Sequence, residues 1–263
     1  MSLPTGPADD ARAALACLDL TSLNDDDSAV SIAVLAAKAA GPAGRPAALC
    51  VWPRFVAQAR AQLAVRGAGG VRVAAVANFP AGGTDIDAAL REVRQIVFAG
   101  ADEVDLVLPW RALAAGDASV ASALVCAVRR ATPGRTLKLI IESGELQTEA
   151  LVQQACRIGL DEGVDFLKTS TGKTATGATP EAARTMLAAI AAHPRGAQVG
   201  FKASGGVRKV ADAAVYIALV RQILGGAALV PQRLRFGASG LLADIEQVLT
   251  SAGPRNIAAP GAY

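Results

Sequence analysis

The feature of this sequence that best suits chemistry is a lysine at the end of a short apolar run. Residues 166–173 read Phe-Leu-Lys-Thr-Ser-Thr-Gly-Lys, so Lys168 leads into a glycine-containing loop that carries a second lysine, Lys173. This arrangement suits attack of an amine on a carbonyl, with an anionic group of the substrate held nearby. The alternative is a strand followed by a solvated turn, because most lysines are exposed.

Lysine is scarce in this chain, which makes each lysine informative. Of the 26 basic residues only six are lysines, so ordinary surface charge is carried by arginine. Arginine does not lose its proton in a protein and therefore cannot act as an amine nucleophile. Lys168, Lys173 and Lys202 remain as candidates for chemistry. We interpret the other three lysines as surface charges: Lys38, Lys138 and Lys209.

A carboxylate lies inside another apolar run, where residues 104–108 read Val-Asp-Leu-Val-Leu. If Asp105 faces the interior, it needs a cationic partner or it becomes protonated, and Lys168 and Lys202 are the available cations. The Lys202 ammonium would also disfavour protonation of Lys168 and raise its free-amine fraction. The alternative is an ion-pair network without a catalytic role, because such networks also perturb pKa values.

Glycine-rich loops follow the last two apolar runs. Gly205-Gly206 comes shortly after Lys202, and residues 237–240 read Gly-Ala-Ser-Gly before a helical pattern. Loops at these positions of a barrel commonly bind phosphate through backbone N–H groups and a helix N-terminus. Glycines also make ordinary turns, so each loop by itself is weak evidence.

Eight apolar runs alternate with helical patterns, and these elements must position the polar residues. We expect strands over residues 15–20, 48–53, 71–79, 103–109, 137–142, 165–170, 198–203 and 234–238. We expect helices over residues 28–40, 54–68, 84–99, 118–131, 148–162, 180–192, 210–224 and 241–249. Eight such units predict an α/β fold, a closed (β/α)8 TIM barrel with its active site at the strand C-terminal ends. A doubly wound open sheet is the competitor, but no glycine fingerprint follows the first run.

Composition favours one domain acting on a small molecule. The chain has 263 residues, 52% of them hydrophobic, and a barrel of this size is often a single unit. We expect an N-terminal extension over residues 1–14, a barrel over 15–251 and a flexible tail over 252–263. The net charge is +3 without a basic block, and aromatic residues make up 4%, which argues against nucleic-acid binding.

The thiols, the single histidine and the N-terminus narrow the class further. The four cysteines form no metal-type or redox spacing, and we expect reduced thiols in a cytoplasmic protein: Cys17, Cys50, Cys126 and Cys156. His193 precedes a proline, where a structural role fits, so triads and multi-histidine metal sites are poorly supported. We expect neither a secretion signal nor a membrane span, since no segment has the required apolar length.

Motifs on seven of the eight expected strands together resemble deoxyribose-phosphate aldolases. The residues that carry the resemblance are 19–21 (Asp-Leu-Thr), 50–55 (Cys-Val-Trp-Pro-Arg-Phe), 102–105 (Asp-Glu-Val-Asp), 140–146 (Ile-Ile-Glu-Ser-Gly-Glu-Leu), 167–173 (Leu-Lys-Thr-Ser-Thr-Gly-Lys), 200–208 (Gly-Phe-Lys-Ala-Ser-Gly-Gly-Val-Arg) and 235–239 (Arg-Phe-Gly-Ala-Ser). The motifs occur in order, and the resemblance runs from about residue 15 to residue 249.

The resemblance implies a class I aldolase that uses no metal and no cofactor. Such an enzyme reversibly cleaves 2-deoxy-D-ribose 5-phosphate to acetaldehyde and D-glyceraldehyde 3-phosphate. By position, Lys168 would carry the Schiff base, Lys202 would tune it, and Asp105 would work with Lys202 in proton transfer. The phosphate would lie at Gly172, Lys173, Gly205, Gly206 and Ser239. The resemblance also implies a homo-oligomer, a dimer or a tetramer, and from the composition we expect no nucleic-acid or membrane partner.

Five further positions are of interest. Gly240 stands where relatives commonly carry a second serine, which bears on phosphate affinity. Asp19 and Thr21 end the first run, and Cys50 is either a small buried hydrophobe or a trap for an unsaturated aldehyde. Tyr263 ends a tail that is long enough to reach the barrel mouth. Because some members of the similar family also end in a tyrosine, the resemblance implies that it could relay a proton to the enamine, and the alternative is an incidental aromatic at a disordered chain end.

Two alternatives remain open at this point. One is another class I sugar-phosphate aldolase, transaldolase-like, which would share the lysine and the phosphate site but use a different donor. The other is a non-catalytic sugar-phosphate-binding barrel. That protein would have no need of ionisable residues on three different strands.

Overall fold

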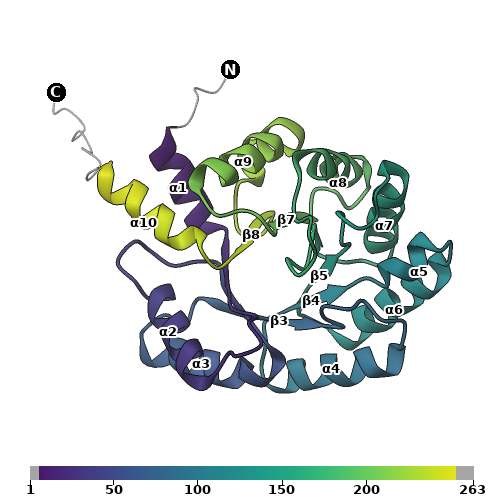
Figure 1. The fold of residues 1–263 in the computed structure, drawn as a ribbon, viewed down its shortest axis with the longest axis horizontal. Coiled ribbons are helices and arrows are strands. Elements are labelled where there is room, and N and C mark those ends of the chain that lie inside the picture. The colour runs from purple at the N-terminus through teal and green to yellow at the C-terminus, as the bar shows by residue number, and fades with distance from the viewer. Residues whose placement is uncertain (1–5, 253–263) are drawn as a thin grey trace.

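Eight parallel strands close into one barrel, and they follow one another in chain order (Figure 1). The structure is a computed structural model that describes residues 6–252. The strands are β1 (Leu18–Thr21), β2 (Ala48–Val51), β3 (Arg72–Ala77), β4 (Glu103–Val107), β5 (Thr136–Ile140), β6 (Phe166–Lys168), β7 (Gly200–Ser204) and β8 (Leu234–Ala238). The predicted single-domain (β/α)8 TIM barrel is confirmed.

Helices surround the barrel on its outside (Figure 1). They are α1 (Pro7–Ala16), α2 (Ala29–Ala39), α3 (Val56–Val65), α4 (Ile86–Phe98), α5 (Trp110–Ala114), α6 (Ala118–Ala131), α7 (Glu149–Asp161), α8 (Pro180–Ala192), α9 (Val210–Leu224) and α10 (Leu241–Ser251), with 3-10 turns η1 (Pro53–Phe55) and η2 (Gly226–Ala228). Among the described residues, no helix has both the length and the apolar character that crossing a membrane requires.

Side-chain caps fix where several outer helices begin. The Thr148 and Thr179 hydroxyls accept hydrogen bonds from the N–H groups of Leu151 and Ala182, and so start α7 and α8. Asp117 caps α6 in the same way. Each cap stabilises a helix end by about 1 kcal/mol, because it satisfies an N–H group that has no partner within the helix.

The inside and the outside of the barrel differ sharply in chemistry. Strand residues that point outward form a continuous apolar core with the helices. Inside the barrel, Leu23, Cys50, Ala74 and Val76 make a small separate apolar cluster on the β2 and β3 side. Much of the remaining interior is filled by buried charged side chains. The barrel therefore has a charged interior that is surrounded by an apolar layer between the strands and the helices.

Two features at the N-terminal half differ from the expectation. The first strand begins at Leu18 and not at residue 15, because α1 continues to Ala16 and buries Ala11, Ala14 and Leu15 on one helical face. Most of α1 falls in the stretch that we expected to be an extension, and it packs beside α9 and α10 (Figure 1). The short helix α5 was not anticipated.

Candidate active site

Seven charged side chains from six strands meet inside the barrel, and each is at most 3% exposed. They are Asp19, Glu103, Asp105, Lys138, Lys168, Lys202 and Arg235. The strand register brings them together: Asp105 pairs with Lys138 across β4 and β5, and Lys168 pairs with Lys202 across β6 and β7. Lys202 in turn pairs with Arg235 across β7 and β8.

Asp105 is the hub of this cluster because it contacts all three lysines. Its Oδ1 accepts a hydrogen bond from Lys138 Nζ at 2.8 Å. Its Oδ2 accepts one from Lys168 Nζ at 2.8 Å and one from Lys202 Nζ at 2.7 Å. These contacts hold the pKa of Asp105 well below its usual range, although burial by itself would raise it. Asp105 is therefore an ionised carboxylate shared among three cations.

Lys138 and Lys202 also take part in a second group of ion pairs, on the side that faces away from Lys168. Asp19 accepts from Lys202 Nζ and from Arg235 Nη1, and Lys138 Nζ lies 3.3 Å from Asp19 Oδ2. Glu103 Oε2 lies 2.5 Å from Lys138 Nζ, and its Oε1 accepts from Arg235 Nη2 at 2.7 Å. Three carboxylates and three cations thus already pair with one another without Lys168.

The pKa of Lys168 moves in the opposite direction from those of the two neighbouring lysines. Burial lowers the pKa of Lys168, and the Lys202 ammonium lowers it further. The negative charge of Asp105 raises this pKa, but not by enough to reverse the shift. Burial also acts on Lys202 and Lys138, but two carboxylates raise the pKa of Lys202 and three raise that of Lys138. With Lys168 as the free amine, the buried cluster carries three negative and three positive charges.

The assignment of Lys138 to the surface was wrong, because this lysine is fully buried and bonded to Asp105. The sequence held a usable signal, since Lys138 interrupts the apolar run of β5 as Asp105 interrupts β4. Sequence reasoning also gave no role to Glu103 and Arg235. Glu103 stands two residues before Asp105, so in a strand the two share the inward face.

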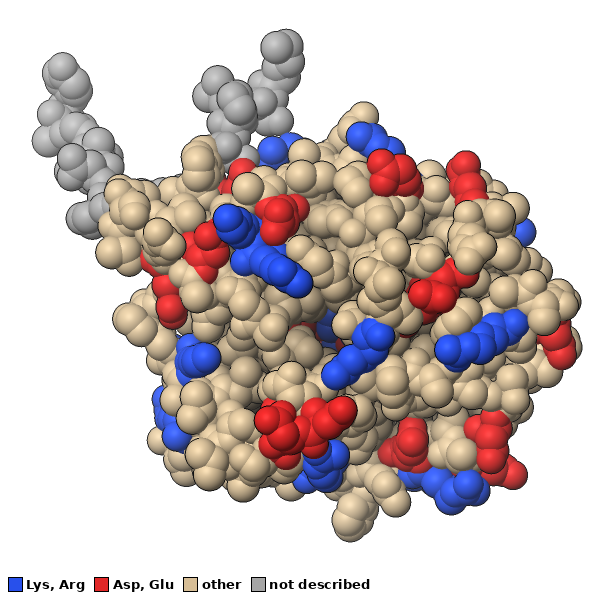
Figure 2. Space-filling view, in the orientation of Figure 1, with Lys and Arg blue, Asp and Glu red and all other residues tan. Residues whose placement is uncertain are grey.

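A cavity of about 260 Å³ opens at the C-terminal ends of the strands. Of the seven charged side chains, Lys168 is the one that lines it. The candidate phosphate residues line the same cavity: Gly172, Lys173, Gly205, Gly206 and Ser239. In Figure 2, basic and acidic side chains are interspersed over one face of the molecule, and basic atoms are visible within a hollow near its centre.

Backbone geometry explains the glycines around this cavity. Gly172, Gly205 and Gly206 have φ angles of 77°, 80° and 89°, which L side chains rarely adopt. Within residues 6–252, their N–H groups donate to no other described residue. At Gly237 a Cβ atom would lie 3.0 Å from Lys202 Cε, so this glycine makes room for the lysine. At Gly240 a Cβ atom would meet nothing within 4 Å.

Two of the accessory positions lie beside the charged cluster. Thr21 lines the cavity and donates from Oγ1 to the backbone oxygen of Asp19 at 2.8 Å. Cys50 is fully buried, with its Sγ 4.0 Å from Asp105 Oδ2. Burial and the Asp105 charge raise the pKa of the Cys50 thiol. Among the described residues, no group of three or more His, Cys, Asp or Glu side chains is arranged to hold a metal ion. Tyr263 lies outside the described residues.

The chain matches the model of the DeoC/LacD family aldolases over residues 13–244. It belongs to this aldolase family. Among solved structures, a "putative deoxyribose-phosphate aldolase" from Toxoplasma gondii ME49 is 25% identical with a TM-score of 0.85, over 93% of this chain and 95% of that one. One of the same description from Coccidioides immitis is 25% identical with a TM-score of 0.78, over 94% and 88%.

A third structure shares the fold at lower identity. The deoxyribose phosphate aldolase from Aeropyrum pernix, described as having a unique tetrameric structure, is 22% identical with a TM-score of 0.69, over 94% of each chain. The cavity and the lysines described above therefore belong to an aldolase.

Proposed function

We propose that this aldolase reversibly cleaves 2-deoxy-D-ribose 5-phosphate to acetaldehyde and D-glyceraldehyde 3-phosphate through an imine on Lys168. The observation that carries the proposal is the charge arrangement in the barrel. Three carboxylates balance three other cations, so Lys168 is left as a buried amine that faces the cavity. A free amine is the form that attacks a carbonyl.

The cleavage follows from amine chemistry. Lys168 Nζ attacks the aldehyde carbon of the open-chain sugar, and the carbonyl oxygen leaves as water to give an iminium. The electron pair of the C2–C3 bond then moves toward the iminium while the C3 hydroxyl loses its proton, which releases D-glyceraldehyde 3-phosphate. Protonation of the resulting enamine and hydrolysis by water release acetaldehyde and restore the Lys168 amine.

Asp105 and Lys202 are suited to moving protons in these steps. Asp105 contacts both Lys202 Nζ and Lys168 Nζ. A proton that leaves the imine nitrogen therefore has an acceptor next to it in Asp105, and a proton that reaches this nitrogen has a nearby donor in Lys202. The pKa of Asp105 is lowered and that of Lys202 is raised, so Asp105 is in the deprotonated form that accepts a proton and Lys202 is in the protonated form that donates one. As a coupled set, they would titrate together and not as separate groups.

The phosphate is assigned to the loops after β6, β7 and β8. Backbone N–H groups of Gly172, Gly205 and Gly206 lack other acceptors within the described chain, and α10 begins at the same cavity. Lys173 adds a charge, and its Nζ now donates to the backbone oxygen of Leu23 at 2.7 Å. This contact must be given up or shared when a phosphate binds.

Borohydride reduction of the enzyme with acetaldehyde or with the sugar phosphate tests the proposal. We expect a reduced adduct on Lys168 by peptide mass mapping and none in Lys168→Arg, whose guanidinium stays protonated. An adduct on Lys202 or Lys173 would contradict the assignment. Turnover with a dihydroxyacetone donor but not with acetaldehyde would favour the transaldolase-like alternative, and no adduct at all would favour a binding protein.

Two wider assignments accompany this function. We assign the protein to a reducing compartment, the cytoplasm, because Cys17, Cys50, Cys126 and Cys156 are free thiols in the structure. We also expect self-association, supported by the tetrameric architecture described for the Aeropyrum pernix protein. Size-exclusion chromatography with light scattering measures the oligomeric state directly.

A further inference from the structure

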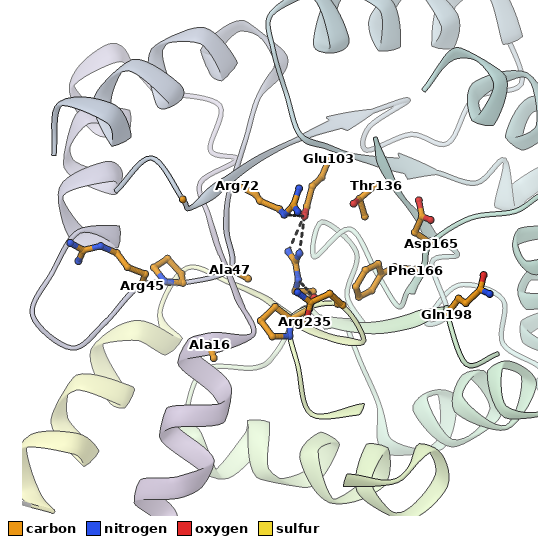
Figure 3. Close-up of a pocket in the computed structure, with 14 residues that line it drawn as sticks. Ala16, Arg45, Ala47, Arg72, Glu103, Thr136, Asp165, Phe166, Gln198 and Arg235 are labelled. Carbon is orange, nitrogen blue, oxygen red and sulfur yellow. Dashed lines mark hydrogen bonds and ion pairs between the residues drawn. The ribbon is translucent and has the colours of Figure 1, made fainter. Parts of the chain in front are cut away.

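The buried ion pairs extend from the proposed reactive lysine to the opposite end of the barrel. There a second cavity, of about 590 Å³, is lined by residues that begin the strands, among them Glu103, Thr136 and Phe166. Figure 3 shows Arg235 and Glu103 facing each other at the centre of this cavity, with Arg72 beside Glu103. This pair separates the charged interior from solvent at the N-terminal end.

Both members of the pair have their polar atoms fully engaged. Arg235 donates from Nη2 to Glu103 Oε1 at 2.7 Å, from Nη1 to Glu103 Oε2 at 3.1 Å and to Asp19 Oδ1, and from Nε to the backbone oxygen of Pro231. Glu103 Oε2 also contacts Lys138 Nζ. Glu103 is fully buried and Arg235 is 3% exposed, so solvent screens neither charge effectively.

Two chains of contacts lead from this pair to the carboxylate that holds Lys168. In one chain, Glu103 contacts Lys138, and Lys138 contacts Asp105. In the other, Arg235 contacts Asp19, Asp19 contacts Lys202, and Lys202 contacts Asp105. Any change in charge at Glu103 or Arg235 therefore alters how strongly Lys138 and Lys202 interact with Asp105.

We propose that Glu103 and Arg235, at the far end of the barrel, are positioning residues that set how strongly Asp105 interacts with Lys168. Neither side chain contacts Lys168. The proposal deepens the function proposed above and rests on it, because it concerns the free-amine fraction of the same lysine.

The groups that face Lys168 come from five strands, and the proposal concerns their sum. Asp105 on β4 contacts it directly, and Lys202 on β7 pairs with it across the sheet. Cys50 on β2 is a neutral thiol with a raised pKa. Lys138 on β5 and Asp19 on β1 act through Asp105 and Lys202. Just beyond β5, Glu142 accepts from the N–H of Thr171 at 3.2 Å and faces the loop after β6.

Neutralising each member of the pair has opposite expected effects. In Glu103→Gln, Lys138 loses one carboxylate partner and interacts more strongly with Asp105. The interaction of Asp105 with Lys168 is then weaker, so the pKa of Lys168 falls. In Arg235→Met, Asp19 interacts more strongly with Lys202, and Glu103 interacts more strongly with Lys138. Asp105 then interacts more strongly with Lys168, so the pKa of Lys168 rises. A unit charge about 10 Å away at an effective dielectric constant near 20 gives a shift of roughly one pH unit.

The experiment measures the Lys168 titration in two ways. The first readout is the pH dependence of Lys168 acetylation by acetic anhydride, mapped by peptide mass, which needs no enzymatic activity. The second is the pH dependence of borohydride-trapped adduct formation with acetaldehyde. We expect the midpoint to move down by roughly one pH unit in Glu103→Gln, up by a similar amount in Arg235→Met, and back to near the parent value in the double variant.

Matched controls separate charge coupling from a structural role. Asp102→Asn makes the same charge change one residue away, at a carboxylate that pairs with Arg60 outside the barrel, and should leave the midpoint in place. If Arg235→Met does not fold, the shift in Glu103→Gln still decides the matter, and the double variant, which leaves no unpaired member of the pair, shows whether that shift is reversed. Thermal unfolding monitors the fold of every variant.

The outcomes distinguish this inference from the proposed function. An acetylation midpoint that stays at the parent value in folded Glu103→Gln, or one that does not return toward the parent value in the folded double variant, overturns the inference, and the pair then only closes the barrel. Opposite shifts in acetylation support it. If the parent enzyme forms no adduct while the acetylation midpoints of the variants shift as expected, the proposed function is overturned and the coupling remains in place.

Discussion

Three lysines contact one carboxylate in the barrel, and their other partners decide what each can do. Lys138 also reaches Asp19 and Glu103, and Lys202 also reaches Asp19, so the pKa of each is raised in spite of burial. Within the part of the chain that the structure describes, Lys168 contacts Asp105 but no second carboxylate, and its pKa is lowered. The number of nearby carboxylates thus distinguishes Lys168, the nucleophile that we propose, from the two lysines whose pKa values are raised.

Removal of either neighbouring lysine should make Lys168 a poorer nucleophile at neutral pH. In Lys138→Met or Lys202→Met, Asp105 loses one cation and holds Lys168 more strongly, so the pKa of Lys168 rises. The pH profile of kcat/KM, which reports the free enzyme, should move to higher pH in both variants. Lys38→Met is the matched control, because this lysine is exposed and outside the cluster.

The result for Lys138 is the more informative of the two. An unchanged profile in Lys138→Met, with the fold retained, would show that this lysine is an inert part of the barrel filling. An unchanged profile in Lys202→Met with weaker substrate binding would instead make Lys202 a substrate ligand.

At the scale of elements, the sequence predicted those whose ends are marked by local chemistry. The expected bounds of α6, α8 and α9 agree with the structure, since Asp117 and Thr179 cap α6 and α8, Pro180 opens α8, and Gly225 ends α9. The short helix α5 carries no side-chain cap, and α1 merges into the apolar run of β1 without a proline or glycine between them. Those boundaries depend on packing that a local pattern does not contain.

The site was predictable where a polar residue interrupts an apolar strand, as Asp105, Lys168 and Lys202 do. Lys138 gave the same signal but was set aside because lysines are mostly exposed. The roles of Glu103 and Arg235 required the closed barrel, since their contacts join β4 to β8, which are 132 residues apart in the chain. No spacing in the sequence expresses such a contact.

The loops after β6 and β7 act as one element at the cavity. The Ala178 N–H donates to the backbone oxygens of Ser204 and Gly205, both at 3.0 Å. A Cβ atom at Gly177 would lie 2.4 Å from the Gly205 oxygen, so the two backbones touch. The residues that we assign to the phosphate are held in place by this contact.

Gly177→Ala should therefore separate phosphate binding from imine chemistry. Forcing the two loops apart should raise KM for the phosphorylated sugar by roughly tenfold, which corresponds to about 1.4 kcal/mol of lost binding. The rate of adduct formation with acetaldehyde, which carries no phosphate, should stay near that of the parent enzyme. Gly69→Ala is the control, since a Cβ atom there meets nothing within 4 Å. Equal losses with both substrates would mean that the loops also position Lys168.

For the whole molecule, the buried cluster makes the stability of the fold depend on pH in a defined direction. The pKa values of Asp19 and Asp105 are lowered, so their contribution is present above their unfolded values near 4 and is lost as the pH falls. The pKa values of Lys138 and Lys202 are raised, so their contribution is present below about 10.4 and is lost as the pH rises further. Between these limits the network stabilises the barrel.

Lys168 contributes with the opposite sign, and this leads to a prediction for the whole fold. Its pKa is lowered on folding, so below the unfolded value near 10.4 the folded protein must hold this side chain against its tendency to be charged. Lys168→Met should therefore unfold at a higher urea concentration than the parent at pH 7, and this gain should shrink as the pH approaches 10.4. Asp105 keeps two cationic partners, Lys138 and Lys202, in the variant.

Urea unfolding of the parent, Lys168→Met and Lys38→Met at pH 7 and pH 10 measures this effect. The exposed Lys38 should give no gain at either pH, so a gain in that variant would point to a general effect of methionine. A Lys168→Met protein that is less stable than the parent at pH 7 would contradict the assignment of Lys168 as the unbalanced charge. The expected result would mean that the reactive amine is retained at the expense of stability, because a buried group poised for chemistry is one that the fold would hold more easily without.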